Sequence, residues 1–287
     1  MQNNSLIKLV ECPRDAMQGW KHLISTEEKI EYINCLLQVG FDTIDFGSFV
    51  SPKAIPQMAD TKDVVKRLVL GNSKTKLLAI VANLRGAEEA VACDEINYLG
   101  FPFSVSETFQ QRNTNSSITE ALERTKDIQA LCVKNNKELV VYISMGFGNP
   151  YGDPFTSAIV FNWVQKIAGL GVKTISLADT VGLAAPEQVY AMTAYLVKQL
   201  PAHEIGVHLH SSAANWKDKL DAAVNAGCKR FDGALKGIGG CPMAGDDLVG
   251  NMDTELMVPY FQEKGMLHQL NLAALQECSR IAAKIFI

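Results

Sequence analysis

Short apolar runs rich in Ile, Val and Leu recur along the chain, separated by longer amphipathic stretches. Runs of this length and composition predict buried strands, and the amphipathic stretches predict helices with one face against a core. The predicted strands cover 6–10, 43–46, 76–81, 96–100, 139–144, 174–177, 205–210 and 230–232. The predicted helices cover 25–40, 61–70, 87–93, 117–135, 157–170, 186–200, 216–226, about 254–264 and 271–285.

Local signals support several of these boundaries. Ser25 and Glu28 have the spacing of a capping box, and Gly40 is the residue expected just beyond a helix end. The segments 40–44, 169–175 and 226–231 each read as a helix stop, a short loop and a new strand. The pattern is therefore one of repeated βα units.

Alternating strands and helices predict a parallel sheet with right-handed crossovers. Eight such units in a chain of 287 residues favour a (β/α)₈ TIM barrel over an open doubly wound sheet. No GxGxxG follows the first strand, which weakens a Rossmann interpretation. No linker-like stretch interrupts the chain, so we expect one domain over 1–287, with two extra C-terminal helices after the eighth strand.

Composition narrows the class of partner. The formal net charge of −4 argues against nucleic acid or a membrane surface, and no apolar run approaches the ~18 residues of a membrane helix. The seven cysteines are an odd number and contain no CxxC pair. We therefore expect a cytoplasmic protein whose thiols are mostly small core residues.

Polar residues gather where the predicted strands end, which is where TIM barrels carry their active sites. In chain order these residues are Arg14, Asp15, Asp45, Ser48, Asn83, Ser144, Asp179, Thr180, His208, His210, Cys241 and Asn251. Because the carboxyl ends of the strands meet at one rim, we expect these groups to converge.

His208 and His210 are two residues apart on a predicted strand, so alternation would place both imidazoles on one face. With Asp15 and Asn251 they offer two nitrogens and two oxygens, a set that suits Mg²⁺ or Mn²⁺ better than a thiolate zinc site. Zinc and iron remain open from ligand type alone. The alternative is a pair of core histidines hydrogen-bonded to their neighbours.

Arg14 lies next to Asp15 and could brace the rim or stabilise developing enolate charge. Asp45 and Asp179 could be caps, ion-pair partners or catalytic acids. The segment 237–242, GIGGCP, could present the Cys241 thiol as a proton donor, or form a Gly-rich turn or phosphate cradle.

The chain resembles the 3-hydroxy-3-methylglutaryl-CoA lyase family over nearly its whole length. The matching segments are 10–18 (VECPRDAMQ), 48–53 (SFVSPK), 56–58 (PQM), 83–86 (NLRG), 176–182 (SLADTVG) and 237–242 (GIGGCP). The second and the last of these distinguish the lyases from the related isopropylmalate, citramalate and homocitrate synthases.

The resemblance implies metal-assisted cleavage of 3-hydroxy-3-methylglutaryl-CoA to acetyl-CoA and acetoacetate, a reaction of leucine degradation and ketone-body metabolism. It implies a divalent metal held by Asp15, His208, His210 and Asn251. The implied catalytic residues are Arg14, Cys241, Asp45, Asp179 and His208, with either His208 or Asp179 as the base. Arg14, Gln18, Asn83, Ser144 and Thr180 are expected to bind the acyl-CoA substrate, and a homodimer is expected.

Several positions depart from the family pattern. Ser211-Ser212 follow His210 where the family usually has Asp-Thr, and Asp45 is a shorter acid than the usual Glu. Ala16 replaces Gly, Met145 replaces Cys and Met243 replaces an aromatic residue. We expect these changes to shift the acyl preference within branched 3-hydroxyacyl-CoAs. The alternatives are a Claisen-type synthase using acetyl-CoA and a non-catalytic acyl-CoA-binding barrel.

Overall fold

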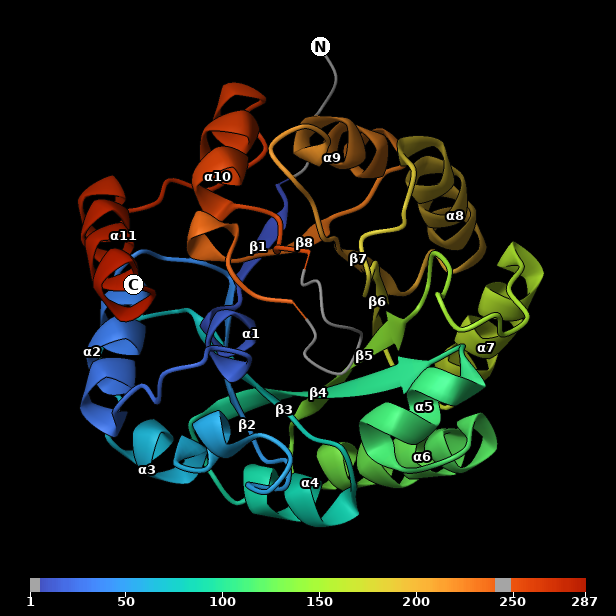
Figure 1. Cartoon of the computed structure of the whole chain (residues 1–287), viewed down its shortest axis with the longest axis horizontal. Helices are drawn as coiled ribbons and strands as arrows, with labels where there is room; N and C mark the ends of the chain where they lie inside the picture. Colours follow the sequence, from blue (N-terminus) through green and yellow to red (C-terminus); the bar gives the residue numbers. More distant parts are fainter. Residues whose placement is uncertain (1–5, 241–248) are drawn as a thin grey trace.

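The computed structural model describes residues 6–240 and 249–287, which form a closed barrel of parallel strands surrounded by helices (Figure 1). The strands are β1 Lys8–Glu11, β2 Thr43–Ser48, β3 Lys76–Ile80, β4 Ile96–Ser104, β5 Glu138–Ser144, β6 Thr174–Ala178, β7 Glu204–His208 and β8 Arg230–Gly233. Each pairs with the next in chain order, and β1 closes the barrel against β8 with Lys8 opposite Arg230. The predicted TIM barrel is confirmed.

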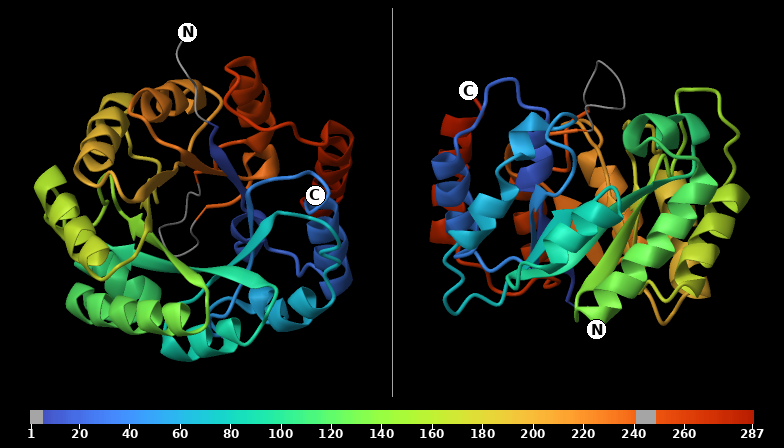
Figure 2. Two further views of the ribbon diagram at one scale, coloured as in Figure 1. Left: turned by 180° about the vertical axis from the view of Figure 1, so that it is seen from behind. Right: turned by 90° about the horizontal axis from the view of Figure 1, so that it is seen from below.

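Most of the helices surround the strands (Figure 2), whereas α1 lies over the ends of the strands (Figure 1). They are α1 Pro13–Gln18, α2 Thr26–Leu36, α3 Thr61–Lys66, α4 Leu84–Val91, α5 Glu107–Thr114, α6 Ile118–Lys134, α7 Ser157–Gly169, α8 Pro186–Gln199, α9 Trp216–Asn225, α10 Thr254–Glu263 and α11 Leu272–Ile285. Two short 3₁₀ turns, η1 Pro56–Met58 and η2 Leu235–Gly237, complete the elements. No described helix has both the length and the hydropathy needed to cross a membrane.

Helix boundaries follow capping chemistry. The predicted capping box at α2 is present, with Ser25 Oγ accepting from the Glu28 N–H and the Glu28 carboxylate accepting from the Ser25 N–H. The helix stops at Leu36 rather than Gly40, and Gly40 takes the left-handed φ of +92° at the turn into β2. The two predicted C-terminal helices are confirmed as α10 and α11.

Three strand and helix predictions need correction. Strand β7 ends at His208, so the prediction that His210 lies on the same strand is wrong. Strand β4 continues to Ser104, four residues beyond the predicted end, because every residue from Tyr98 to Ser104 pairs with β5. Helices α1 and α5 were not predicted; both are short, and packing rather than length stabilises them.

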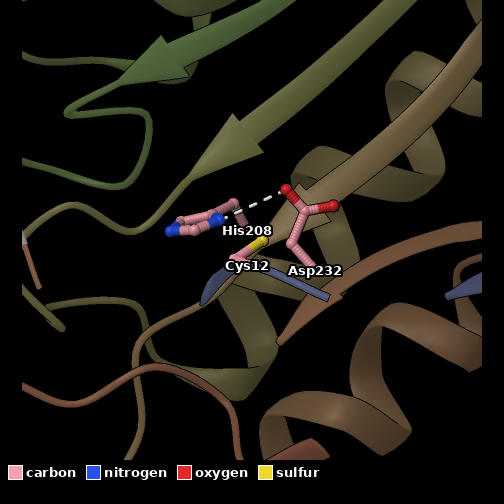
Figure 3. Close-up of side chains that lie close together, drawn as sticks. All are labelled: Cys12, His208 and Asp232. Carbon is pink, nitrogen blue, oxygen red and sulfur yellow. Dashed lines mark hydrogen bonds and ion pairs between the residues drawn. The ribbon is translucent and has the colours of Figure 1, made fainter. Parts of the chain in front are cut away.

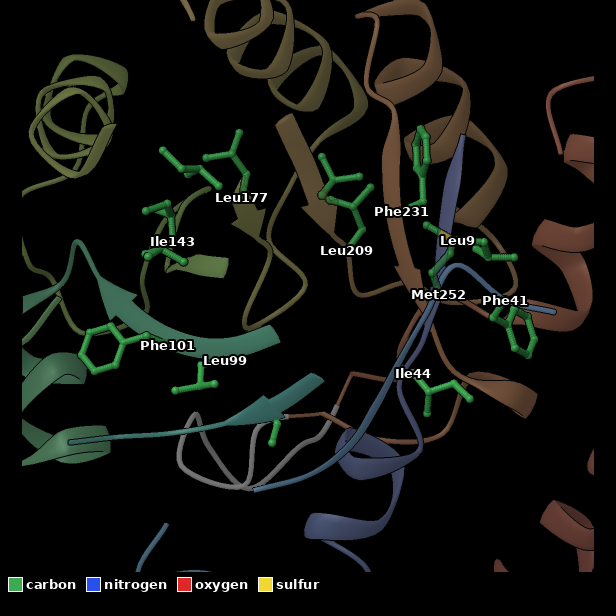
Figure 4. Packing of buried hydrophobic residues seen from close by; sticks show 14 of the residues in the cluster. Leu9, Phe41, Ile44, Leu99, Phe101, Ile143, Leu177, Leu209, Phe231 and Met252 are labelled. Atoms are coloured by element: carbon green, nitrogen blue, oxygen red, sulfur yellow. The ribbon is translucent and has the colours of Figure 1, made fainter. Parts of the chain in front are cut away.

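Two apolar layers hold the barrel together. The larger lies between the sheet and the helices and includes Leu9, Ile44, Phe101, Ile143 and Phe231, some of which Figure 4 shows pointing outward from the strands. The smaller lies inside the barrel. This alternation decides which strand residues reach the interior, and so which can reach a site at its mouth.

Candidate active site at the carboxyl ends of the strands

A cavity opens at the carboxyl ends of the strands, where the sequence placed the chemistry. Eight of the predicted site residues line it, namely Arg14, Asp15, Gln18, Asn83, Ser144, Thr180, His208 and His210. Ser48 lines it as well. Asp45, Asp179 and Asn251 are not among the described residues that line the cavity, and Cys241 and Met243 lie outside the described residues.

Arg14 is fixed by two carboxylates. Helix α1 begins directly after β1, with Pro13 in its first turn, and this carries Arg14 and Asp15 onto the rim. Arg14 Nε and Nη2 donate to the Asp45 carboxylate at 3.1 and 2.5 Å, and Nη1 donates to Asp15 Oδ1 at 2.8 Å. Burial alone would lower the pKa of Arg14, but the two carboxylates raise it, so the group stays charged. Its orientation is set before any ligand arrives.

Asp15 is the centre of the polar cluster. Its Oδ1 accepts from Arg14 and from Gln18 Nε2, and its Oδ2 accepts from Asn251 Nδ2 at 2.7 Å and from the Gly240 N–H at 3.3 Å. Burial opposes ionisation, but Arg14 and the nearby imidazoles outweigh it and hold the pKa of Asp15 well below its usual value. Asp15 is therefore ionised at neutral pH.

His210 reaches the site from beyond the strand. It forms an isolated antiparallel bridge with Asn251, which brings the segment after β8 against the end of β7. The His208 and His210 rings lie 5.3 Å apart and are tilted by 59°. Ligand atoms of Asp15, His208 and His210 all lie within 4.8 Å of one another. The two imidazoles thus converge as predicted. His210 reaches the site from the segment after β7, however, and not by alternation along the strand.

The pKa values of the two imidazoles shift in opposite directions. Burial, followed by the neighbouring His208, lowers the pKa of His210 to about 4, so His210 is neutral at pH 7. Its buried Nδ1 has no hydrogen-bond partner among the residues that the structure describes. Burial would also lower the pKa of His208, but the hydrogen bond to Asp232 and the charge of Asp15 raise it.

Asp232 is a site residue that the sequence analysis missed. Its Oδ2 lies 3.2 Å from His208 Nδ1, and Figure 3 shows the carboxylate beside the imidazole ring, with Cys12 below. The side chain is fully buried on β8. With Nδ1 engaged by Asp232, His208 presents Nε2 to the cavity. The signal was available, because Asp232 ends the eighth predicted strand just as His210 ends the seventh.

Asp179 is engaged by the protein. Its Oδ2 accepts from Lys219 Nζ at 2.7 Å, and its Oδ1 accepts from the Ala184 N–H at 3.0 Å. Lys219, on α9, is itself buried and also donates to the His210 carbonyl at 2.8 Å. The pair therefore connects the segment after β6 to the backbone of a site histidine.

The remaining predicted binding residues have mixed surroundings. Asn83 caps α4 by accepting from the Gly86 N–H, and Thr180 Oγ1 accepts from the Met145 N–H at 2.8 Å. Both also line the cavity together with Ser144. Tyr142 was missed, although it lies two residues before Ser144 on β5 and so on the same face of the strand. Its ring stands edge-on to His208 at 5.9 Å.

The glycine segment after η2 passes close to Asp15. At Gly239, with φ +118°, a Cβ would lie 2.3 Å from Asn251 Nδ2 and 3.0 Å from the Asp15 carbonyl. Only glycine permits this approach. The segment thereby holds Asn251 against Asp15 and leads directly to position 241.

The donor set fits a divalent cation. Asp15 is an ionised carboxylate, His210 is a neutral imidazole with a buried unpartnered nitrogen, and Asn251 brings an amide group against Asp15. One ligating carboxylate with imidazole and amide donors suits Mg²⁺ or Mn²⁺. A second group, Cys12, His208 and Asp232, also lies within 4.8 Å, but burial raises the thiol pKa of Cys12 far above its usual value and so disfavours the thiolate a metal needs.

The chain is similar in sequence and in structure to known proteins. Residues 7–282 match the family model described as HMGL-like. The mitochondrial hydroxymethylglutaryl-CoA lyase of Macaca fascicularis is 33% identical over 274 residues, covering 94% of this chain and 83% of that protein. A hydroxymethylglutaryl-CoA lyase of Bacillus subtilis is 33% identical over 268 residues, covering 93% and 89%. The structure of an HMG-CoA lyase from Acinetobacter baumannii with coenzyme A and 3-methylmalate superposes with a TM-score of 0.92 at 30% identity, covering 100% of this chain and 93% of that one.

Proposed function

The chain belongs to the HMGL-like family, and from this premise we propose that it cleaves 3-hydroxy-3-methylglutaryl-CoA to acetyl-CoA and acetoacetate with a divalent cation. We propose that residues 1–287 act as one lyase domain. The observation that carries the proposal is the sharing of one carboxylate, Asp15, between the guanidinium of Arg14 and the imidazole pair. A fixed positive group thus stands beside a cation site in one cavity.

This arrangement suits the cleavage of a carbon–carbon bond next to a tertiary alcohol. When bound by Asp15, His208, His210 and Asn251, Mg²⁺ or Mn²⁺ would lower the pKa of the substrate hydroxyl and draw in the substrate carboxylate. As the hydroxyl loses its proton, the C–O bond becomes a ketone, and the electron pair of the broken C–C bond passes to the thioester fragment as an enolate.

Arg14 would stabilise that enolate. Its guanidinium is held by Asp45 and Asp15, so no reorganisation is needed when negative charge develops. The enolate then takes one proton to become acetyl-CoA, and we propose the Cys241 thiol as its donor, directly or through water. Gly239 and Gly240 place the start of that segment beside Asp15.

For His208 we propose the ligand role rather than the base role. Asp232 engages Nδ1, so Nε2 is left to serve either the cation or a proton, and one nitrogen cannot do both at once. For Asp179 we propose a positioning role, because Lys219 and the Ala184 N–H engage its two oxygens away from the cavity. The hydroxyl proton would then leave to water in the cavity once the cation has lowered the hydroxyl pKa.

The substrate would enter as an acyl-CoA with its carboxylate and hydroxyl toward the cation. Gln18, Asn83, Ser144 and Thr180 line the wall and are proposed to bind the acyl portion, with Tyr142 as an added contact. Buried Ser211 stands where an acid is usual, and its hydroxyl contacts Met252 Sδ. We propose that such changes widen the preference toward related branched 3-hydroxyacyl-CoAs.

We also propose a cellular setting for the reaction. One curated relative, a human lyase 31% identical to this chain, is described as cytoplasmic, and we propose the same compartment here. A role in leucine degradation and ketone-body metabolism and assembly as a homodimer, with the C-terminal helices as contacts, are proposed with the reaction.

The direct test is an assay of purified protein with 3-hydroxy-3-methylglutaryl-CoA and Mg²⁺ or Mn²⁺, with and without a chelator. We expect equimolar acetoacetate and acetyl-CoA that disappear with chelator. Condensation of acetyl-CoA with a 2-oxo acid, without cleavage, would favour the synthase alternative. Tight binding of the acyl-CoA with no turnover under any divalent metal would favour the non-catalytic barrel.

A further inference from the structure

Two cysteines far apart in the chain meet on the outside of the barrel. Cys35 lies near the end of α2, and Cys278 lies in the middle of α11. Their sulfur atoms are 2.7 Å apart, with the Cys278 thiol donating to Cys35 Sγ, although 243 positions separate them in sequence. Both are free thiols. Neither belongs to the cavity described above.

The two helices are packed against each other independently of these thiols. Figure 1 shows α11 beside α2, with the C-terminus next to them. Phe286, just after α11, packs edge-on against Tyr32 of α2 and against Trp20. Cys278, Ile281 and Ala282 of α11 are buried in the main core. The sulfur atoms are therefore held together by the packing of their helices and need little movement to reach the covalent distance of about 2.05 Å.

The pair also has the accessibility that oxidation requires. Cys278 is fully buried, but Cys35 is partly exposed, so a small oxidant can reach one member of the pair. Burial raises the pKa of both thiols, but the hydrogen bond from Cys278 partly offsets this for Cys35. Cys35 is the attacking sulfur because it is the partly exposed member of the pair. Cys35 Sγ also donates to the Ala274 carbonyl of α11 at 3.7 Å, a second contact that holds it against this helix.

We propose that Cys35 and Cys278 are a site of reversible intramolecular disulfide formation that ties α11 to α2. A low-molecular-weight disulfide such as glutathione disulfide is the oxidant. Cys35 attacks one of its sulfurs and releases one small thiol, and Cys278 then displaces the second small thiol from the mixed disulfide. The two cysteines lose two electrons and two protons, and the oxidant is reduced to two thiols.

The disulfide between Cys35 and Cys278 would also restrain the glycine segment that follows η2 and leads to the active site. Ser279, next to Cys278, accepts a hydrogen bond from Lys236 Nζ at 3.1 Å and donates to Glu255. Lys236 immediately precedes Gly237, where the glycine segment begins. Restraining α11 would therefore also restrain Lys236, the residue at which the glycine segment is attached to α11. Because the disulfide would close nearly the whole chain into one loop, it should restrict the unfolded state strongly.

The test uses the full-length wild-type chain treated with glutathione disulfide. Non-reducing peptide mapping is expected to find the peptide of Cys35 joined to that of Cys278 within one chain. The melting temperature is expected to rise by roughly 5–10 °C and to return after treatment with dithiothreitol. Cys35→Ser should abolish the shift, whereas Cys93→Ser, a matched change at another helix-end cysteine, should preserve it.

The proposal is overturned by a map in which Cys35 and Cys278 stay reduced or are joined only to other cysteines or to a second chain. If the disulfide forms but the melting temperature does not change, the claim that it stabilises the fold by tying α11 to α2 is wrong. The peptide map needs no variant, so failure of Cys35→Ser to fold would not obstruct the test. Neither readout depends on lyase activity.

Discussion

Replacing Asp232 by Asn tests the way the site holds His208. The variant preserves the size and shape of the side chain but removes its charge. In the wild type, Oδ2 lies 3.2 Å from His208 Nδ1. Oδ1 is buried and has no partner within 6–240 and 249–287, so over these residues the bond to His208 is the carboxylate's one hydrogen bond. A neutral amide would hold the ring with a weaker hydrogen bond and would make Nε2 less basic.

The expected loss can be estimated from this one contact. Carboxylates that support a ligating histidine typically contribute 10- to 100-fold in metal affinity. That range corresponds to about 1.4–2.8 kcal/mol of binding free energy. We therefore expect the Kd for Mn²⁺ to rise by this factor, with activity recovering when the metal concentration is raised.

Calorimetric titration of the apoprotein with Mn²⁺ would measure the change. Glu204→Gln is the matched control, because Glu204 begins β7, at the opposite end from His208, and pairs there with Lys8 and Arg230. Its Kd should equal that of the wild type. If Asp232→Asn folds normally and binds Mn²⁺ as tightly as the wild type, the assignment of Asp232 as a positioning residue is wrong.

Three further outcomes are expected. Arg14→Lys loses the forked contact with Asp45, so kcat should fall roughly 100- to 1,000-fold, and steady-state kinetics with an unchanged kcat would contradict the enolate role. Lys219→Met leaves the buried charge of Asp179 without its cationic partner, so the free energy of unfolding in urea should fall by about 3–5 kcal/mol and be largely restored in the double variant with Asp179→Asn. Burial raises the pKa of Glu11 to about 8 from 4.5, so the folded state binds more protons than the unfolded state and the wild type loses stability as pH rises between these values. Glu11→Gln should flatten that dependence, and equal slopes for the two proteins would refute the assignment.

Much of the fold was predictable because its signals are local. Apolar runs separated by amphipathic stretches located all eight strands, and the Ser25 capping box located the start of α2. Helices α1 and α5 escaped prediction because each is too short for helical periodicity to emerge. The extension of β4 to Ser104 depends on pairing with β5, which no local pattern reveals.

The candidate site was predictable where its residues lie at the ends of predicted strands. Asp15, His208 and His210 converge, but His210 does so through a bridge with Asn251 that strand alternation did not foresee. Asp232 was missed although it ends a predicted strand, because its contact with His208 depends on the pairing of β7 with β8. Lys219 was missed because its importance comes from a tertiary partner, Asp179, which it reaches from a helix. A buried lysine on an amphipathic helix looks like a surface residue until its partner is known.

The central claim is that one divalent cation held by this cluster is required for carbon–carbon cleavage. The most direct measurement titrates metal-free protein with Mn²⁺ and follows bound Mn²⁺ by electron paramagnetic resonance, together with the rate of acetoacetate formation from 3-hydroxy-3-methylglutaryl-CoA. The account predicts that binding and rate rise together and saturate at one ion per chain, and that both are lost in His210→Ala. Acetoacetate formed at full rate without metal, or saturated binding without any product, would contradict it.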